Sequence, residues 1–361
     1  DYAARGISPQ WGLYQDDSHQ TQAGWPLPGS WESDLRLFDP SNVDWQNYLI
    51  AQEQGVASKL AFDGWHVDQL GNSDVYNYAG QQVNLAAGYS SFLKKAKSVI
   101  GGDLVMNAVD DYAESEIMKS GATQFAYEEL WGGNPYYSDI LRLVETNWKS
   151  KSTKPSTVFA AYMNKPLGQL GGQFNTPGVL LTEATIFAAG GAHIELGEHM
   201  LSNEYFPNDN LQTTTQLLGL ITPYYDFSVA YENLLRGGVK PLTLPVSIKY
   251  QKISNGLAMI PGTIWTFARS TANGSTKVIH LINMKTAQDD AWRDDFGKRH
   301  AVKKLSNFTV TFKQSTKVHK IWTANPDGTN IAPVALKFTQ SKGVVTVNVP
   351  SLTYWTMLVV K

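Results

Sequence analysis

Hydrophobic and polar positions alternate in two different ways along the chain. Up to about Arg236, short β-type runs alternate with stretches in which hydrophobic residues recur every three or four positions. From about Pro241 onward, only short β-type runs remain. The first pattern predicts parallel strands joined by crossover helices, and the second predicts an antiparallel β-sandwich. We therefore predict an α/β region at residues 1–238 and a C-terminal β-sandwich at residues 239–361.

The first region contains six candidate strands, at residues 34–38, 60–68, 103–109, 124–130, 157–163 and 192–197. Hydrophobic residues at helical spacing predict helices at residues 85–99 and 137–148, and one long final helix at 212–236. Two more helices have expected N-caps. Ser41 is one, with Asp44 three residues later as in a capping box, and Thr176 is the other, followed by Pro177 at the first helical position. A β/α barrel needs eight strands, and a doubly wound sheet usually shows a glycine-rich turn after its first strand, which is absent here.

The second region contains eight candidate strands separated by turn signals such as Asn273-Gly274 and Pro326-Asp327-Gly328. They lie at residues 246–251, 263–268, 277–282, 308–312, 317–323, 335–339, 344–349 and 355–360.

Composition narrows the classes of function. Lys and Arg number 30 against 32 Asp and Glu, for a net charge of −2, which argues against a nucleic-acid-binding protein or a polybasic membrane anchor. No apolar run approaches the 18 residues or so of a transmembrane helix. The absence of Cys excludes disulfides and thiolate sites. It is compatible with an exported bacterial protein, and we expect a secreted or cell-surface location.

The segment at residues 61–72 holds the densest group of reactive side chains. Asp63, Trp65, His66 and Asp68 stand within six positions, where a predicted strand leaves its apolar stretch. Catalytic groups of β/α barrels lie at such strand ends, and Trp suits the flat apolar face of a sugar ring. The alternative is a strand end at which Asp68 only caps the following loop.

A second carboxylate group ends a later strand, in Tyr127-Glu128-Glu129-Leu130-Trp131. Neighbouring residues of a strand point to opposite faces, so only one of the two Glu side chains can face a cleft together with Asp68. The strand with Asn107 lies between the two segments. Two carboxylates in one cleft are what glycoside hydrolysis requires; solvated loop acids are the alternative.

The segment His193-Ile194-Glu195-Leu196-Gly197-Glu198-His199 combines residue types that bind metals. Its spacing matches no standard zinc motif. Substrate contacts or ordinary strand-end polarity account for it better, and we expect neither a metal nor a cofactor.

Several segments resemble glycoside hydrolase family 66, which contains bacterial endo-dextranases and cycloisomaltooligosaccharide glucanotransferases. The resemblance runs along nearly the whole chain. It is carried by Phe62–Gly71 and Tyr127–Trp131, and also by residues 6–13, 38–42, 203–207 and 231–236.

The resemblance implies a catalytic pair. Asp68 follows the Gly-Trp pair by three residues, as the family's nucleophile does, and Glu129, just before an aliphatic residue and Trp, matches its acid/base. The family reaction is retaining cleavage of α-1,6-glucosidic bonds without a metal. The sugar contacts expected by position are Asp63, Trp65, His66, Asn107, Tyr127 and Trp131.

The family fold implies a (β/α)8 TIM-type barrel followed by a C-terminal antiparallel β-sandwich. Its positions make residues 34–38 the third barrel strand and residues 192–197 the eighth. The first two strands and an N-terminal β-domain would then precede Asp1. We therefore expect a second chain or an N-terminal segment to complete the barrel.

The expected activity is endo-hydrolysis of dextran to isomaltooligosaccharides. Cyclising relatives carry an inserted carbohydrate-binding domain, and none is visible between Asp34 and Arg236. Cycloisomaltooligosaccharide glucanotransferase activity is the first alternative. A non-catalytic glucan-binding protein is the second, although a pure binder needs neither acid. An amylase-type hydrolase fits less well, because it places its acid one strand after the nucleophile.

Overall fold

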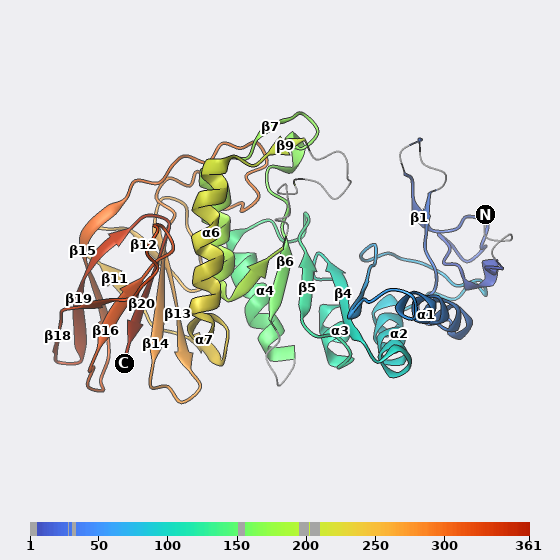
Figure 1. Cartoon of the computed structure of the whole chain (residues 1–361), viewed down its shortest axis with the longest axis horizontal. Coiled ribbons are helices and arrows are strands. Elements are labelled where there is room, and N and C mark those ends of the chain that lie inside the picture. Colours follow the sequence, from blue (N-terminus) through green and yellow to red (C-terminus); the bar gives the residue numbers. More distant parts are fainter. Residues whose placement is uncertain (1–5, 28, 31–33, 151–155, 195–201, 203–209) are drawn as a thin grey trace. The chain divides into compact units, whose positions relative to one another are not determined.

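The computed structural model describes residues 6–27, 29–30, 34–150, 156–194, 202 and 210–361 (Figure 1). The chain forms two compact units. The first comprises residues 1–129 with 150–155, and the second comprises residues 130–149 with 156–361. Among the described residues, no helix combines the length and hydropathy that crossing a membrane would need.

The first unit is built on three parallel strands, β3 (Gly64–Val67), β4 (Asp103–Val109) and β5 (Ala126–Glu129), with β4 in the centre. Three helices accompany them: α1 (Val43–Ala57), α2 (Leu85–Ile100) and α3 (Glu114–Lys119). Helix α2 begins because the Asn84 side chain accepts from the backbone N–H of Ala87, and it ends at Gly101 in the left-handed region. Its apolar face packs on Leu104 and Met106 of β4.

Residues 34–38 do not form a parallel strand, contrary to the prediction. Within this segment β2 (Leu35–Arg36) pairs antiparallel with β1 (Gly24–Trp25), and Phe38 forms an isolated antiparallel bridge with Gly12. Gly24 permits this pairing, because a Cβ there would lie 2.0 Å from the Leu35 carbonyl oxygen. The other predicted strands of this unit exist, but residues 60–68 and 124–130 shorten to β3 and β5.

The N-cap of α1 is Asn42, not Ser41. The Asn42 side chain accepts from the N–H groups of Asp44 and Trp45. The Ser41 hydroxyl instead donates to the Asp39 carboxylate at 2.6 Å, so it is not the cap. A 3-10 turn at Pro9–Trp11 precedes these elements.

The second unit contains two further parallel strands, β6 (Thr157–Ala160) and β8 (Gly191–His193). Its helices are α4 (Tyr137–Ser150), α5 (Thr176–Ala189), α6 (Thr215–Ala230) and α7 (Glu232–Leu235), with a 3-10 turn at Lys165–Leu167. Residues 178–189 of α5 are buried throughout, so this helix forms the centre of the unit's core. The predicted strand at 192–197 ends at His193, and residues 195–197 lie outside the described part.

Two helix boundaries differ from the prediction. Asn175 caps α5 by accepting from the Gly178 N–H, so Thr176 is already helical. The expected helix at 212–236 begins at Thr215, because Thr214 is its N-cap. The preceding residues form β9 (Leu211–Gln212), paired with β7 (Gly172–Gln173). Tyr231, at φ −113°, separates α6 from α7.

The C-terminal part contains two sheets, which are antiparallel except where β12 pairs in parallel with β13. One has the order β10-β13-β14-β20-β16-β17, with β12 alongside β13, and the other has the order β11-β15-β19-β18. Side chains of both sheets, such as Ile279, Val310, Val347 and Leu358, form one hydrophobic core. The strands are β10 (Val239–Leu242), β11 (Val246–Ile248), β12 (Ile253–Asn255), β13 (Ile264–Thr271), β14 (Lys277–Asn283), β15 (Leu305–Lys313), β16 (Ile321–Ala324), β17 (Val334–Leu336), β18 (Phe338–Ser341), β19 (Val344–Leu352) and β20 (Trp355–Val360).

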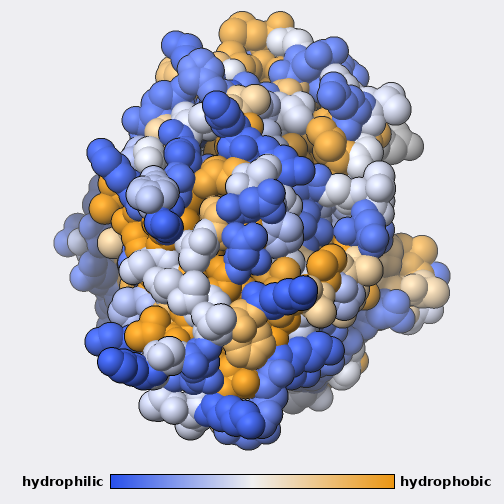
Figure 2. All heavy atoms as spheres, turned by 90° about the vertical axis from the view of Figure 1, so that its left-hand side faces the viewer, coloured by the Kyte–Doolittle hydropathy of each residue, from blue (hydrophilic) through white to orange (hydrophobic). Residues whose placement is uncertain are grey.

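Three details of this part were missed by the sequence patterns. Strand β10 carries Pro241 and lies at a sheet edge, where a missing N–H is tolerated. Strand β12 is only three residues long. The predicted strand at 335–339 is two strands, β17 and β18, that belong to different sheets. Figure 2 views this side of the molecule and shows hydrophobic areas in several places between hydrophilic ones.

Candidate active site

Three polar side chains meet where the parallel strands of the first unit end. Asp68 directly follows β3, Asn107 lies in β4, and Glu129 is the last residue of β5. The register aligns them, because Val67 pairs with Met106 and Val109 pairs with Glu129. The carboxyl ends of parallel strands point the same way, so one edge of the sheet carries all three groups.

The side-chain amide of Asn107 bridges the two carboxylates. Its Nδ2 donates to Asp68 Oδ1 at 3.0 Å and to Glu129 Oε2 at 2.8 Å. Because one nitrogen donates to both oxygens, these cannot be farther apart than the two distances together, about 5.8 Å. Retaining glycosidases hold their two carboxyl groups about 5 to 5.5 Å apart, whereas inverting enzymes need about 6.5 Å or more.

Gln69 holds this arrangement and was not predicted. Its Nε2 donates to the backbone carbonyl of Asn107 at 2.8 Å and to that of Tyr112 at 3.3 Å. Its backbone N–H donates to Asp68 Oδ1 at 2.8 Å. Asp68 Oδ1 thus accepts two hydrogen bonds, one from this N–H and one from Asn107 Nδ2. The sequence signal that could have pointed to Gln69 is its place directly after Asp68, and the structure leaves it only 6% exposed.

Glu128 lies away from this group. Along β5, Ala126 and Glu128 are buried while Tyr127 and Glu129 are partly exposed, as strand alternation requires. Glu128 is fully buried and close to Glu114 of α3. Burial, followed by the charges of Glu128 and Asp111, raises the pKa of Glu114 well above its ordinary value.

The remaining predicted site residues divide by position. His66 stands two positions before Asp68 and Tyr127 two before Glu129, so strand alternation puts them on the same faces as the carboxylates, and their rings lie 4.7 Å apart. Trp65 points to the other face of β3 and packs edge-on against Phe92 of α2. Asp63 precedes β3, at the end opposite to Asp68, and five extended residues span roughly 16 Å. The structure therefore brings neither Trp65 nor Asp63 to the carboxylate pair.

Trp131 belongs to the second unit. Lys165 Nζ lies over its ring, 3.5 Å from the ring centroid, and the Tyr162 ring lies 5.4 Å away. This indole is therefore already in contact with a cation.

A cavity of about 280 Å³ reaches Asp68 in the first unit. Its walls are largely apolar and include Trp45, Val67, Tyr89, Phe92 and Met106. Burial and the neighbouring Tyr112 and Asp68 raise the pKa of the Tyr89 hydroxyl, so Tyr89 stays neutral beside Asp68.

No cluster of three or more metal-binding side chains occurs among the described residues. His193, the first residue of the segment that combines metal-binding residue types, has its Nδ1 2.8 Å from Glu183 Oε1, and both side chains are buried. Glu195, Glu198 and His199 lie outside the described residues.

Comparison with known proteins identifies the family. The profile of Glycosyl hydrolase family 66 matches residues 1–359. The chain belongs to this family. It shares 24% identity with a cycloisomaltooligosaccharide glucanotransferase of Niallia circulans, over all of this chain and 51% of that protein. A dextranase of Streptococcus salivarius is 26% identical over 90% of this chain and 46% of its own length. The chain thus spans about half the length of the curated relatives it matches.

A solved structure has the same fold. The cycloisomaltooligosaccharide glucanotransferase of a Paenibacillus species, complexed with cycloisomaltoheptaose, superimposes with a TM-score of 0.90 at 21% identity. The match covers 99% of this family 66 chain and 71% of the other chain. An α-L-fucosidase of Paenibacillus thiaminolyticus gives a TM-score of 0.54 at 12% identity.

Proposed function

We propose that this chain carries the catalytic pair of a retaining endo-dextranase, with Asp68 as nucleophile and Glu129 as acid/base. The Asn107 amide that bridges the two carboxylates is the observation that carries the proposal. It keeps them close enough for a covalent mechanism, in which one carboxylate attacks and the other transfers a proton.

In the first step, Asp68 attacks the anomeric carbon of an α-1,6-linked glucosyl unit while Glu129 protonates the departing oxygen. The glycosidic bond breaks, and a covalent glucosyl-Asp68 ester forms. In the second step, Glu129 removes a proton from water, which attacks the anomeric carbon and frees Asp68. His66, Tyr127 and Trp131 remain proposed sugar contacts.

Alignment lengths favour hydrolysis over cyclisation. The match to the glucanotransferase extends over 504 positions, many more than the 361 residues of this chain, so that relative has long segments that this chain lacks. The match to the dextranase extends over only 394 positions. Cyclisation is the alternative, because a sugar hydroxyl can replace water in the second step.

The architecture is proposed to be a β/α barrel at residues 1–238 with a β-sandwich at 239–361. Five parallel strands are described, so a complete barrel needs three more rather than the two that the sequence suggested. Strand β3 pairs only with β4 among the described residues, and the apolar cavity lies beside it. An N-terminal segment or a second chain would cover this edge.

The proposed substrate also indicates where the protein acts. Dextran is a polymer too large to enter a cell intact, so its hydrolase acts on the outside. We propose a secreted or cell-surface bacterial protein.

Product analysis of dextran digested by the intact gene product tests the function, with Asp68→Asn as the control. Linear isomaltooligosaccharides that disappear in the variant support the dextranase. A dominant cyclic fraction assigns the protein to the transferases instead. Glucan binding without any products, from a folded protein, overturns the catalytic proposal.

A further inference from the structure

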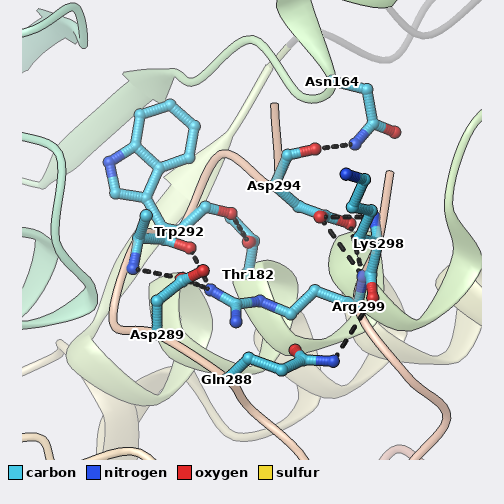
Figure 3. Close-up of polar contacts among 9 residues, drawn as sticks. Asn164, Thr182, Gln288, Asp289, Trp292, Asp294, Lys298 and Arg299 are labelled. Atoms are coloured by element: carbon cyan, nitrogen blue, oxygen red, sulfur yellow. Dashed lines mark hydrogen bonds and ion pairs between the residues drawn. The ribbon is translucent and has the colours of Figure 1, made fainter. Parts of the chain in front are cut away.

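A long loop of the C-terminal β-region, residues 284–304, connects β14 to β15 without regular secondary structure. Loops of this length in compact domains usually have a function. Loop 284–304 is held together by its own hydrogen bonds. The buried guanidinium of Arg299 donates to the Asp289 carboxylate and the Ala291 carbonyl, and Asp294 accepts from the backbone N–H groups of Lys298 and Arg299 (Figure 3).

Trp292 anchors this loop to the segment that follows β5. Its fully buried indole donates from Nε1 to the Asn134 carbonyl at 2.7 Å, and its backbone N–H donates to the Pro135 carbonyl at 3.1 Å. The carbonyl of Trp292 accepts from Thr182 Oγ1 of α5 at 2.8 Å. These contacts fix the position of the next residue, Arg293.

Asn164, in the segment that follows β6, also holds the loop. Its backbone N–H donates to the Arg293 carbonyl at 2.9 Å, and its side-chain amide donates to the Asp294 carbonyl (Figure 3). The loop therefore contacts the connections after two consecutive parallel strands. In β/α folds these connections carry the catalytic and binding residues.

Arg293 then reaches the residue bonded directly to Glu129. Its guanidinium donates to the Leu130 carbonyl at 2.6 Å, while the Leu130 N–H donates to the Ala160 carbonyl at 3.0 Å. Leu130 is thus held by both of its backbone polar groups. The Arg293 guanidinium also lies 5.8 Å from the centre of the Trp131 ring.

We propose that Arg293 is a positioning residue for the acid/base, acting through Leu130 from the C-terminal β-region. A peptide bond is rigid, so fixing the Leu130 backbone restrains the carboxyl-terminal side of Glu129. The inference rests on the proposed roles of Asp68 and Glu129. It assigns loop 284–304 a part in proton transfer, not only in stability.

Two substrates with different leaving groups distinguish a role of Arg293 in positioning Glu129 from a role in general stability. Cleavage of dextran needs a proton on the departing oxygen, whereas fluoride leaves without protonation. A displaced Glu129 therefore impairs cleavage of dextran but spares attack on α-isomaltosyl fluoride. The ratio kcat/KM reports the first irreversible step, so it isolates glucosyl transfer to Asp68 from the later need for a base.

The experiment compares Arg293→Ala, Arg293→Lys and Lys304→Ala in the intact protein. Lys304 is exposed and lies in the same loop. Lys304→Ala therefore removes one positive charge from the loop, as Arg293→Ala does. We expect Arg293→Ala to lower kcat/KM on dextran about 10- to 100-fold, in line with the loss of a charged hydrogen bond. On the fluoride it should change less than about threefold. Arg293→Lys should recover part of the loss, and Lys304→Ala should match the parent.

The outcomes are distinct. Equal losses on both substrates, or no loss on either, overturn the positioning role while leaving the catalytic pair intact. A parent protein that cleaves neither substrate overturns the proposed function instead. Thermal unfolding of each variant is followed in parallel, and if Arg293→Ala unfolds, the comparison is made with Arg293→Lys.

Discussion

Glu128 and Glu129 are neighbours in β5, yet their side chains lie in opposite environments. Glu129 is partly exposed and accepts a hydrogen bond from Asn107, with Asp68 nearby. Glu128 is fully buried on the other face, near Glu114. One strand thus contributes to two carboxylate pairs. The first pair is partly exposed, with the two hydrogen-bonded oxygens no more than about 5.8 Å apart, whereas the second pair is buried.

The largest effect is expected at the accessible pair. Asp68→Asn removes the nucleophile, and turnover of dextran should fall roughly 10⁴-fold or more, measured as new reducing ends. Asp63→Asn makes the same change at the opposite end of β3 and should stay within about twofold of the parent. Near-normal turnover of Asp68→Asn would refute the assignment of the nucleophile.

Substitution of the two adjacent acids tests the comparison directly. Glu129→Gln should lower kcat on dextran about 10²- to 10⁴-fold, the usual contribution of general acid–base catalysis. Glu128→Gln, one residue away, should stay within about threefold, because its side chain cannot reach the substrate. If Glu128→Gln is the more damaging change in a protein of unaltered fold, the acid/base has been assigned to the wrong face.

A smaller effect is expected from the bridging amide. Asn107→Ala removes one hydrogen bond from each carboxylate, and kcat/KM should fall about 10- to 100-fold. Asn107→Asp instead places a third negative charge beside Asp68 and Glu129. Glu129 must be protonated in the first step, so the high-pH limb of the rate profile should move to higher pH. An unshifted limb would mean that residue 107 does not face the acid/base.

The sequence predicted the strands of the site better than the orientation of its residues. Strands β3, β4 and β5 were expected, and their parallel register alone places Asp68, Asn107 and Glu129 at one edge. Trp65 was expected there too, although it stands three positions before Asp68. An odd offset along an extended strand puts two side chains on opposite faces, so the alternation could have excluded it.

Other features depended on partners that are distant in sequence. Residues 34–38 look like a buried strand, but Gly24 allows a close antiparallel approach that local hydrophobicity does not encode. Helix α6 begins after Thr214 because β9 pairs with β7 just before it. The contact between Arg293 and Leu130 joins residues far apart in the chain, and no local pattern reveals it.

The smallest expected effect is on the free energy of unfolding and comes from the buried pair, Glu114 and Glu128. Burial raises the pKa of Glu114 in the folded protein, so the folded state retains a proton that the unfolded chain releases above about pH 4.3. The stability that this proton provides is present at low pH and is lost as the pH rises toward the folded pKa, by at most about 1.4 kcal/mol per pH unit.

Glu114→Gln removes this proton linkage. Relative to the parent, the variant should therefore gain in free energy of unfolding between pH 5 and pH 8, while its kcat on dextran at a fixed pH changes little. Denaturant unfolding at several pH values measures the gain. Asp103→Asn, an exposed matched control in the same unit, should leave the pH dependence nearly unchanged. The contradicting outcome is a difference in free energy of unfolding between Glu114→Gln and the parent that does not change with pH. It would show that Glu114 titrates normally. The two faces of β5 would then differ in access to substrate but not in proton affinity.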